Sequence, residues 1–198
     1  MSDTGTLGIL FQAMNTRNQL RKEIRRLRRS LSPTQQQQAS ISLLRTMRNR
    51  PDFRRAKSIA MYLPNDGEIS PEPLIEHCWK TGKQVYLPVL HPILHNRLWF
   101  VPYTPQTRMI RNIYDIKEPK LLPSTRRAAW ALDLVLLPLV AFDPKGNRMG
   151  MGGGYYDRTF SFKNQKKGLR GPSLIGLAHE IQRVEELPVE SWDIPLTG

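Results

Sequence analysis

The chain has 198 residues, of which 39% are hydrophobic, and its 30 basic and 17 acidic residues give a formal net charge of +13. This length and composition predict one compact domain with a hydrophobic core. No run approaches the roughly 18 apolar residues of a membrane-spanning helix, and Asp3 stands where a secretion signal would be basic. The single cysteine, Cys78, excludes an internal disulfide and a cysteine-rich zinc site. We therefore expect a cytoplasmic protein.

The positive charge is concentrated near the N-terminus. The first 57 residues contain 13 Lys or Arg and only 3 Asp or Glu. Such an asymmetry predicts a polyanionic partner: a nucleic acid, a phosphate compound or a polyglutamylated molecule. Composition alone does not choose among the three.

The N-terminal third of the chain has a helical pattern. Residues 1–15 are expected to form a disordered extension, and residues 16–198 a single domain. From Arg17 onward the apolar residues fall on one stripe (Leu20, Ile24, Leu27, Leu31) with arginines between them. Ser32 and Gln35 then form a capping box, which predicts a second helix that ends before Pro51.

After this point the pattern alternates between strands and helices. The expected strands are 58–63, 85–90, 98–103, 132–142 and 174–178, and Ser70 with Pro71 opens a helix that Gly82 closes. This alternation predicts an α/β domain of three layers, with a mostly parallel sheet flanked by helices. Ligands in such folds bind beyond the carboxyl ends of the strands.

A glycine-rich segment, GNRMGMGGGYYDRTF over 146–160, follows the 132–142 strand at such a place. It fits neither the P-loop nor the dinucleotide fingerprint, because Tyr155 stands where each requires another residue. Its glycines still allow backbone N–H groups to converge on a phosphate. Lys145 and Arg148 add mobile cations, and Asp157 is a candidate magnesium ligand. The alternative is a tight turn with the tyrosines in the core; glycine count leaves the two about even, and the flanking charges favour the phosphate site.

The run FDPKGNRMGMGGGYYDR resembles the signature of the 5-formyltetrahydrofolate cyclo-ligase family. The resemblance continues in order through RNQLRKEIRRLRRSLSP, MYLPNDGEIS, LPVL, IKEP, LDLVLLPLVAF, IGLAHEIQ and LPVESWDIPL. It covers roughly residues 17 to 196. The family implies a Rossmann-like fold, similar to the ribose-5-phosphate isomerase and CoA-transferase-like folds.

The resemblance also implies a reaction. Family members use ATP and Mg²⁺ to convert 5-formyltetrahydrofolate to 5,10-methenyltetrahydrofolate with release of ADP and phosphate. The implied route phosphorylates the formyl oxygen to give an iminium phosphate, which a second nitrogen of the folate then attacks. Such chemistry needs positioning and charge neutralisation more than an acid or a base.

The family's functional positions carry over to this chain as expectations. Candidate catalytic residues are Lys145, Arg148 and Tyr155. ATP-binding candidates are Arg17, Arg21, Arg148, Met149, Gly150, Met151, Gly152, Gly153, Gly154, Tyr155 and Tyr156. Substrate-binding candidates are Leu63, Glu68, Gly152, Gly153, Gly154 and Tyr155. Asp157 and Asp193 are the magnesium candidates, and exchange of Asp157 for Asn should cost no more than roughly 1 kcal/mol of stability.

Two other functions stay open at this stage. The arginine helix could bind RNA through Arg21, Lys22, Arg25, Arg26, Arg28 and Arg29. We prefer a solvated helix face that assists ATP, on which charge reversal at Arg28 or Arg29 would be nearly silent. The chain also stops soon after WDIPL, where the family usually has a further short strand, and this keeps open a folate-binding protein without catalysis. The expected partners are ATP and 5-formyltetrahydrofolate, free or polyglutamylated, bound by a monomer.

Overall fold

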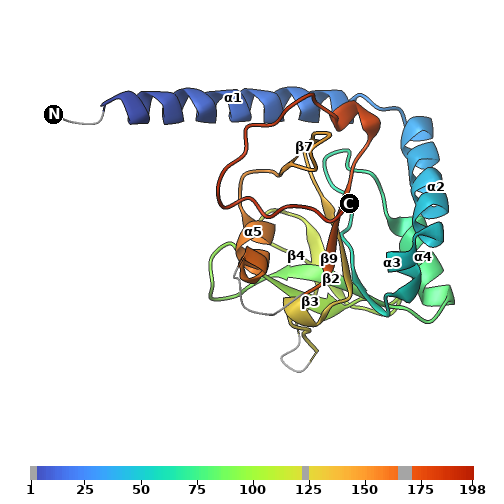
Figure 1. Ribbon diagram of the computed structural model, residues 1–198. Helices are drawn as coiled ribbons and strands as arrows, with labels where there is room; N and C mark the ends of the chain where they lie inside the picture. The colour runs from blue at the N-terminus through green and yellow to red at the C-terminus, as the bar shows by residue number, and fades with distance from the viewer. Residues whose placement is uncertain (1–3, 122–124, 165–170) are drawn as a thin grey trace.

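The computed structural model describes residues 4–121, 125–164 and 171–198, and of residues 4–15 the backbone only. Its centre is a five-stranded sheet in the order β3-β2-β1-β6-β9 (Figure 1). The parallel strands are β1 (Ser58–Ala60), β2 (Gln84–Leu90), β6 (Leu134–Pro138) and β9 (Ser173–Leu177). Strand β3 (Leu98–Pro102) runs antiparallel to β2 at one edge. The predicted α/β class with a mostly parallel sheet is confirmed.

The 132–142 segment differs from the prediction of one strand. It divides into β6 and β7 (Ala141–Phe142), and β7 pairs antiparallel with β8 (Arg148–Met149) in a separate hairpin. The break follows Pro138, which has no N–H to continue the ladder of the main sheet. A second hairpin, β4 (Met109–Arg111) with β5 (Lys117–Pro119), was not predicted, because its strands are too short to have a clear pattern.

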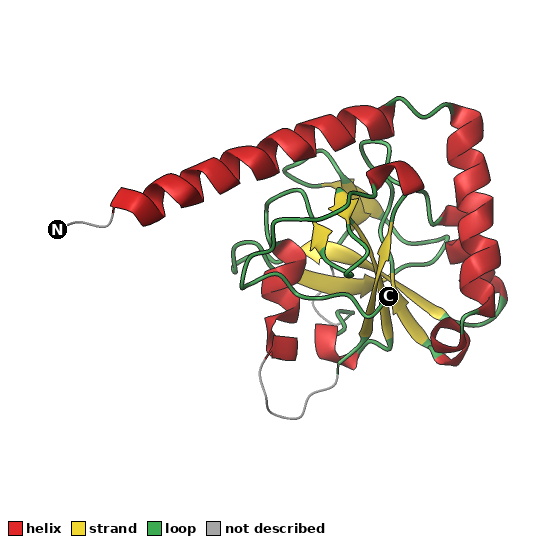
Figure 2. Cartoon of the chain, turned by 45° about the horizontal axis from the view of Figure 1, so that its top comes forward, coloured by secondary structure: helices red, strands yellow, loops and turns green. Residues whose placement is uncertain are grey.

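Helices cover both faces of the main sheet (Figure 2). On one face lie α2 (Pro33–Asn49), α3 (Pro51–Arg55) and α4 (Glu72–Lys80), and the predicted capping box opens α2. Alternate residues of β6 point to opposite faces of the sheet, and Leu134 and Leu136 pack with these helices. Val135 and Leu137 pack on the other face with Phe160 of α5 (Tyr155–Phe160). The described residues also contain the 3₁₀ turns η1 (Ala129–Ala131), η2 (Ser161–Asn164) and η3 (Glu180–Gln182).

Helix α1 (Thr4–Arg29) begins at Thr4, upstream of the Arg17 start that the spacing predicts, and its first part extends away from the sheet (Figure 1). Residues 1–3 of the expected N-terminal extension lie outside the described residues, and the domain boundary stays a prediction. The later part of α1 places Leu20, Ile24 and Leu27 on a cluster that includes Val140 and Met149. Helix α1 therefore covers the β7–β8 hairpin. Among the residues described, no helix is long and apolar enough to cross a membrane.

Candidate functional site

The glycine loop, residues 150–154, connects β8 to α5 beyond the carboxyl end of β6. Gly152 has φ +100° and Gly154, which precedes α5, has φ +64°. Residues other than glycine rarely adopt this left-handed backbone conformation, so the loop can follow this course only with glycine at the two positions. Because α5 has only six residues, anion binding here would depend on loop N–H groups and nearby cations more than on the helix dipole.

Arg21 of α1 lies directly against this loop. Its Nε donates a hydrogen bond to the Gly150 carbonyl at 3.0 Å, and its Nη1 donates to Asn18 Oδ1 at 2.7 Å. A Cβ added at Gly152 would lie 3.6 Å from Arg21 Cζ. Burial, together with the neighbouring charge of Arg17, lowers the pKa of Arg21. The predicted nucleotide-contacting arginine and the predicted ATP loop are thus brought together.

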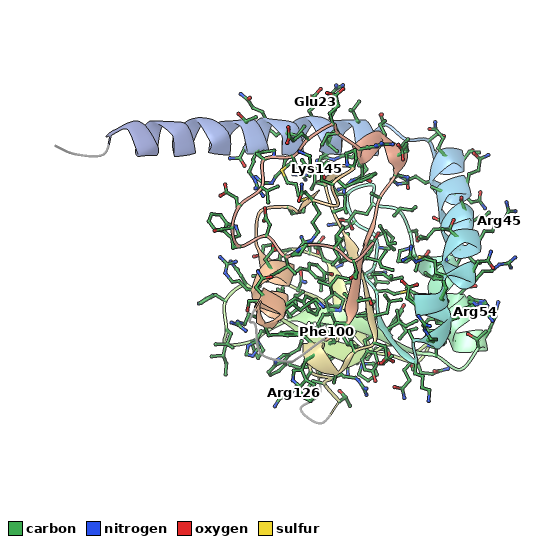
Figure 3. The ribbon with its side chains drawn as sticks, viewed as in Figure 1. Glu23, Arg45, Arg54, Phe100, Arg126 and Lys145 are labelled. Carbon is green, nitrogen blue, oxygen red and sulfur yellow. The ribbon has the colours of Figure 1, made fainter. Side chains whose placement is uncertain are left out.

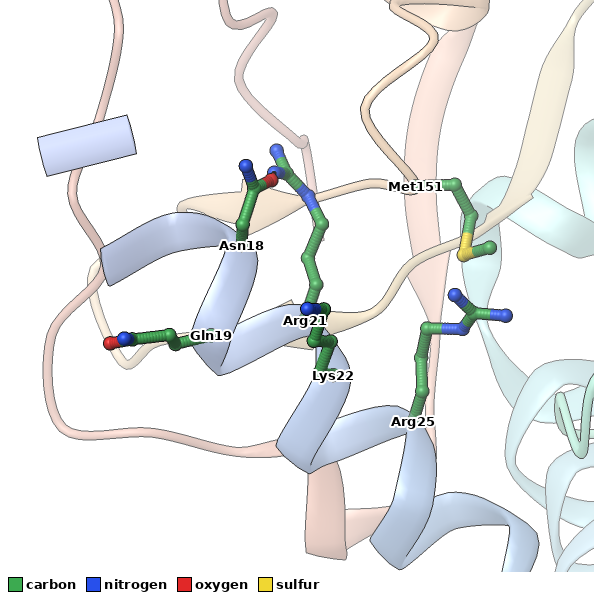
Figure 4. Close-up of a pocket in the computed structure, with 6 residues that line it drawn as sticks. All are labelled: Asn18, Gln19, Arg21, Lys22, Arg25 and Met151. Atoms are coloured by element: carbon green, nitrogen blue, oxygen red, sulfur yellow. Dashed lines mark hydrogen bonds between the residues drawn. The ribbon is translucent and has the colours of Figure 1, made fainter. Parts of the chain in front are cut away.

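An open groove of about 410 Å³ runs between α1 and the loop (Figure 4). We call it the basic groove; its lining residues are Asn18, Gln19, Arg21, Lys22, Arg25 and Met151. Arg25 and Met151 approach each other across it (Figure 4). Three cations beside a glycine-rich backbone are a donor set suited to phosphates or carboxylates.

Arg148 is not the mobile cation that the sequence led us to expect. Its side chain is 5% exposed, and its Nη2 donates to Asp157 Oδ1 at 2.6 Å, while Nε is buried without a partner among the described residues. The main-chain N–H of Ile194 also donates to Asp157 Oδ1, at 3.1 Å. Asp157 therefore joins Arg148 to the C-terminal segment. Arg148 is fixed because β8 places it in the interior.

Asp193 forms a second such pair. Arg17 Nη1 lies 3.3 Å from Asp193 Oδ2 and donates to the Pro188 carbonyl at 2.7 Å. Ile194, the residue after Asp193, donates its main-chain N–H to Asp157. The two magnesium candidates therefore lie on neighbouring segments of the chain. In the described ranges one oxygen of each carboxylate, Oδ2 of Asp157 and Oδ1 of Asp193, makes no hydrogen bond.

These two carboxylates do not form a complete metal cage. No group of three or more His, Cys, Asp or Glu side chains that could hold a metal occurs within residues 4–121, 125–164 and 171–198. Magnesium, however, usually takes one or two carboxylates together with substrate phosphates and water. The donor set beside the glycine loop therefore fits a magnesium ion that arrives with a nucleotide.

The two tyrosines after the loop have different surroundings. The Tyr155 hydroxyl lies 2.7 Å from that of Tyr114, which follows β4 and was not predicted as a site residue. Burial and this hydrogen bond raise the pKa of Tyr155 to about 12, so its hydroxyl stays protonated at neutral pH. Burial, with the nearby Glu68 carboxylate, raises the pKa of Tyr156 as well. Neither tyrosine is suited to act as a base.

Two other predicted residues have structural partners. Met149 is 1% exposed in the cluster under α1, so its side chain belongs to the core and only its backbone could face a nucleotide. Lys145, in the β7–β8 turn (Figure 3), donates to Glu186 Oε1 at 2.6 Å. That bond, which is exposed to solvent, raises the pKa of Lys145.

The predicted folate-contacting residues lie in the loop after β1, residues 61–68, which we call the Glu68 loop. Leu63 is half-buried against the main core. Burial raises the pKa of Glu68 to about 7, although the Asn65 N–H and the charge of Arg28 act in the opposite direction. The Glu68 carboxylate is therefore partly protonated near neutral pH.

The arginine helix is more neutralised than its sequence implies. Arg25, Arg28 and Arg29 all pair with one residue, Asp66. Arg28 is fully buried, so the expectation that its charge reversal would be silent is wrong; the helical spacing did not reveal the loop that covers it. Other basic residues, such as Arg45 of α2 and Arg54 of α3, point outward on a different side (Figure 3).

A glycine loop, a basic groove and a largely buried acid lie at one edge of a mostly parallel sheet. This arrangement is typical of α/β proteins that bind an anionic ligand. A sequence profile of the 5-formyltetrahydrofolate cyclo-ligase family matches residues 13–198. The chain belongs to this family, as the sequence predicts.

Individual relatives agree with this assignment. The chain is 47% identical over 185 residues to the 5-formyltetrahydrofolate cyclo-ligase of Haemophilus influenzae, covering 92% of this chain and 97% of that protein. It is 46% identical over 178 residues to the Escherichia coli cyclo-ligase, covering 87% and 93%. Its structure is similar to that of Aquifex aeolicus 5,10-methenyltetrahydrofolate synthetase, with a TM-score of 0.73, 30% identity, and 91% and 86% of the two chains covered.

Proposed function

We propose that this chain converts 5-formyltetrahydrofolate to 5,10-methenyltetrahydrofolate and consumes ATP in doing so. The observation that carries the proposal is the glycine loop, held against Arg21 at the carboxyl edge of the sheet in a chain of this family. The loop N–H groups and Arg21 would hold the phosphates of ATP. The Glu68 carboxylate would accept hydrogen bonds from the N–H edge of the pterin.

The proposed chemistry begins at the formyl oxygen, which is a poor leaving group. The γ-phosphorus of ATP bonds to this oxygen and its bond to the β–γ bridging oxygen breaks, which releases ADP. The neighbouring folate nitrogen then attacks the formyl carbon and loses its proton to water, and cleavage of the carbon–oxygen bond releases phosphate. Positioning and charge neutralisation supply most of the acceleration in such transfers.

The side chains of the site have distinct parts in this scheme. Tyr155, whose hydroxyl stays protonated, would donate a hydrogen bond to a bound ligand and would not take a proton. Arg148 orients Asp157, and Lys145 supplies a solvent-exposed cation on the β7–β8 hairpin. Asp157 and Asp193 would hold a magnesium ion, which neutralises phosphate charge when bound.

We extend the proposal to the molecule's setting. The single cysteine, buried Cys78, agrees with a cytoplasmic enzyme that needs no disulfide. The basic groove would accept phosphates, or the carboxylates of a polyglutamate tail, from a protein that acts as a monomer. RNA binding by α1 is less favoured, because three of the arginines that it would need are engaged in ion pairs with Asp66.

Mixing the protein with Mg²⁺, ATP and 5-formyltetrahydrofolate tests the proposal. We expect the absorbance of methenyltetrahydrofolate to appear with equal amounts of ADP and phosphate, and only with a divalent metal. Product without ATP consumption would exclude the phosphorylation route. Folate binding without ATP hydrolysis would instead assign a binding protein without catalysis.

A further inference from the structure

A buried arginine outside the predicted site joins three parts of the molecule. The side chain of Arg28, near the C-terminal end of α1, is 1% exposed. Its Nε donates to the Asp66 carbonyl at 2.9 Å and its Nη2 to Asp66 Oδ2 at 2.8 Å. Its Nη1 donates to the Leu139 carbonyl at 3.2 Å. Arg28 therefore ties α1 to the Glu68 loop and to the segment that follows β6.

The guanidinium of Arg28 also faces Glu68, the proposed folate-binding residue. Arg28 Nη1 lies 3.9 Å from Glu68 Oε1, and the Glu68 side chain is only 12% exposed. The Leu139 carbonyl, which Nη1 contacts, also accepts a hydrogen bond from Gln182 Nε2 at 2.7 Å. The cation beside Glu68 is thus held from several sides and has little freedom to move.

Pairing with Asp66 does not by itself explain a buried charge at this position. Arg25 and Arg29 already pair with Asp66, and their side chains are 32% and 54% exposed, so they reach it from the surface. Burying a guanidinium carries a large desolvation cost, which its hydrogen bonds and charged neighbours must offset. Beyond the Asp66 carboxylate, Arg28 reaches the Asp66 and Leu139 carbonyls and the Glu68 carboxylate. Of these groups only Glu68 carries a charge, and neither surface arginine forms an ion pair with it within the described residues.

We propose that Arg28 is a positioning residue for the reaction: it fixes the location and the ionised form of Glu68 and links the nucleotide-side helix to the folate-side loop. The inference rests on the proposed function, because Glu68 contacts a pterin only if the chain binds a folate. Arg28 contacts no reacting atom and acts through Glu68.

The charges around Glu68 predict the consequence of removing Arg28. The titratable groups that face Glu68 are Arg25 and Arg28 of α1, Asp66 of its own loop, Tyr62 after β1, Tyr156 of α5 and, through the adjacent Gly67, His179 after β9. Burial raises the pKa of Glu68 to about 7, and Arg28 limits this rise. Without Arg28 the pKa of Glu68 rises further, and a protonated carboxyl accepts pterin N–H donors poorly.

The test compares Arg28→Gln and Arg28→Lys with a matched control, Arg29→Gln, which removes a different partner of the same Asp66. The acid limb of kcat/KM for the folate reports a group on the free enzyme. For Arg28→Gln we expect this limb to move up by roughly one pH unit or more, because a nearby opposite charge shifts a carboxyl pKa by about that amount. Arg28→Lys, which keeps the cation, should leave the limb in place, and Arg29→Gln should match the parent.

Several outcomes would overturn the inference. An acid limb for Arg28→Gln equal to that of Arg29→Gln would do so, as would equal increases in KM for ATP and for folate. If Arg28→Gln does not fold, Arg28→Lys decides. Lysine lacks the planar guanidinium that binds several groups at once, so KM for the folate should rise several-fold while KM for ATP stays unchanged. An unchanged KM for the folate would overturn the inference.

The parent protein separates this inference from the proposed function. A parent that neither binds 5-formyltetrahydrofolate in a fluorescence titration nor forms product would refute the proposed function. An active parent whose Arg28 variants behave like Arg29→Gln would refute only the role of Arg28.

Discussion

Exchange of Asp157 for Asn tests the site most directly. The sequence alone predicts a loss of no more than roughly 1 kcal/mol of stability. The structure, however, pairs Asp157 with Arg148 at 2.6 Å, with side chains that are 16% and 5% exposed. Asn keeps an acceptor oxygen and removes the charge, which leaves a buried guanidinium uncompensated. Breaking such pairs costs about 3–5 kcal/mol, and hydrogen bonds to charged groups are worth about 1.5–3 kcal/mol. We therefore expect a loss of about 2–3 kcal/mol.

Thermal unfolding and magnesium titration measure the two consequences. For a chain of this size, such a loss lowers Tm by about 5–10 °C. The double variant Asp157→Asn with Arg148→Met removes both charges and should recover most of the lost stability, because a buried pair can be replaced by apolar groups at little cost. Turnover should remain low in both variants, and the single variant should need more Mg²⁺ for half-maximal rate.

Two results would refute this reasoning. A Tm for Asp157→Asn equal to that of the parent would mean that the pair with Arg148 contributes nothing measurable. An unchanged magnesium dependence with retained turnover would place the metal site away from Asp157.

Three further predictions concern the glycine loop, its neighbour Arg21 and the Glu68 loop. Gly153→Ala places a Cβ 2.9 Å from the Tyr155 ring, so we expect turnover to fall at least about tenfold with little change in the circular dichroism spectrum; full activity would make the loop a simple turn. Arg21→Ala should raise KM for ATP and leave KM for the folate unchanged, because Arg21 lies on the glycine loop; equal changes in both would contradict this placement. The pKa of Glu68 is raised from 4.5 to about 7, so the folded state binds a proton that the unfolded state has lost, and its stability falls as pH rises through this window. Glu68→Gln should therefore gain up to about 3 kcal/mol over the parent above pH 7 and nothing below pH 4.5, measured by denaturant unfolding; a constant difference across this range would refute the burial of Glu68.

The sequence by itself determined the class of fold and the place of the glycine loop. Alternation of strand and helix patterns depends on local periodicity, so the five strands of the main sheet and the capping box at Ser32 were predictable. The loop was predictable because its glycines are clustered a few residues beyond a strongly apolar segment. The type and position of Asp157 made it a candidate magnesium ligand in the same way, and this role stays a prediction.

Only the tertiary structure decided which charges pair and which are buried. Arg28 and Arg29 are neighbours with the same chemistry in the sequence, yet one side chain is 1% and the other 54% exposed. Their difference arises because the Glu68 loop and Leu139, far away in the chain, close over one side of α1. Arg148 likewise became a buried partner of Asp157 because β8 pairs with β7. Burial and ion pairing depend on contacts between distant segments, and local sequence patterns do not specify these contacts.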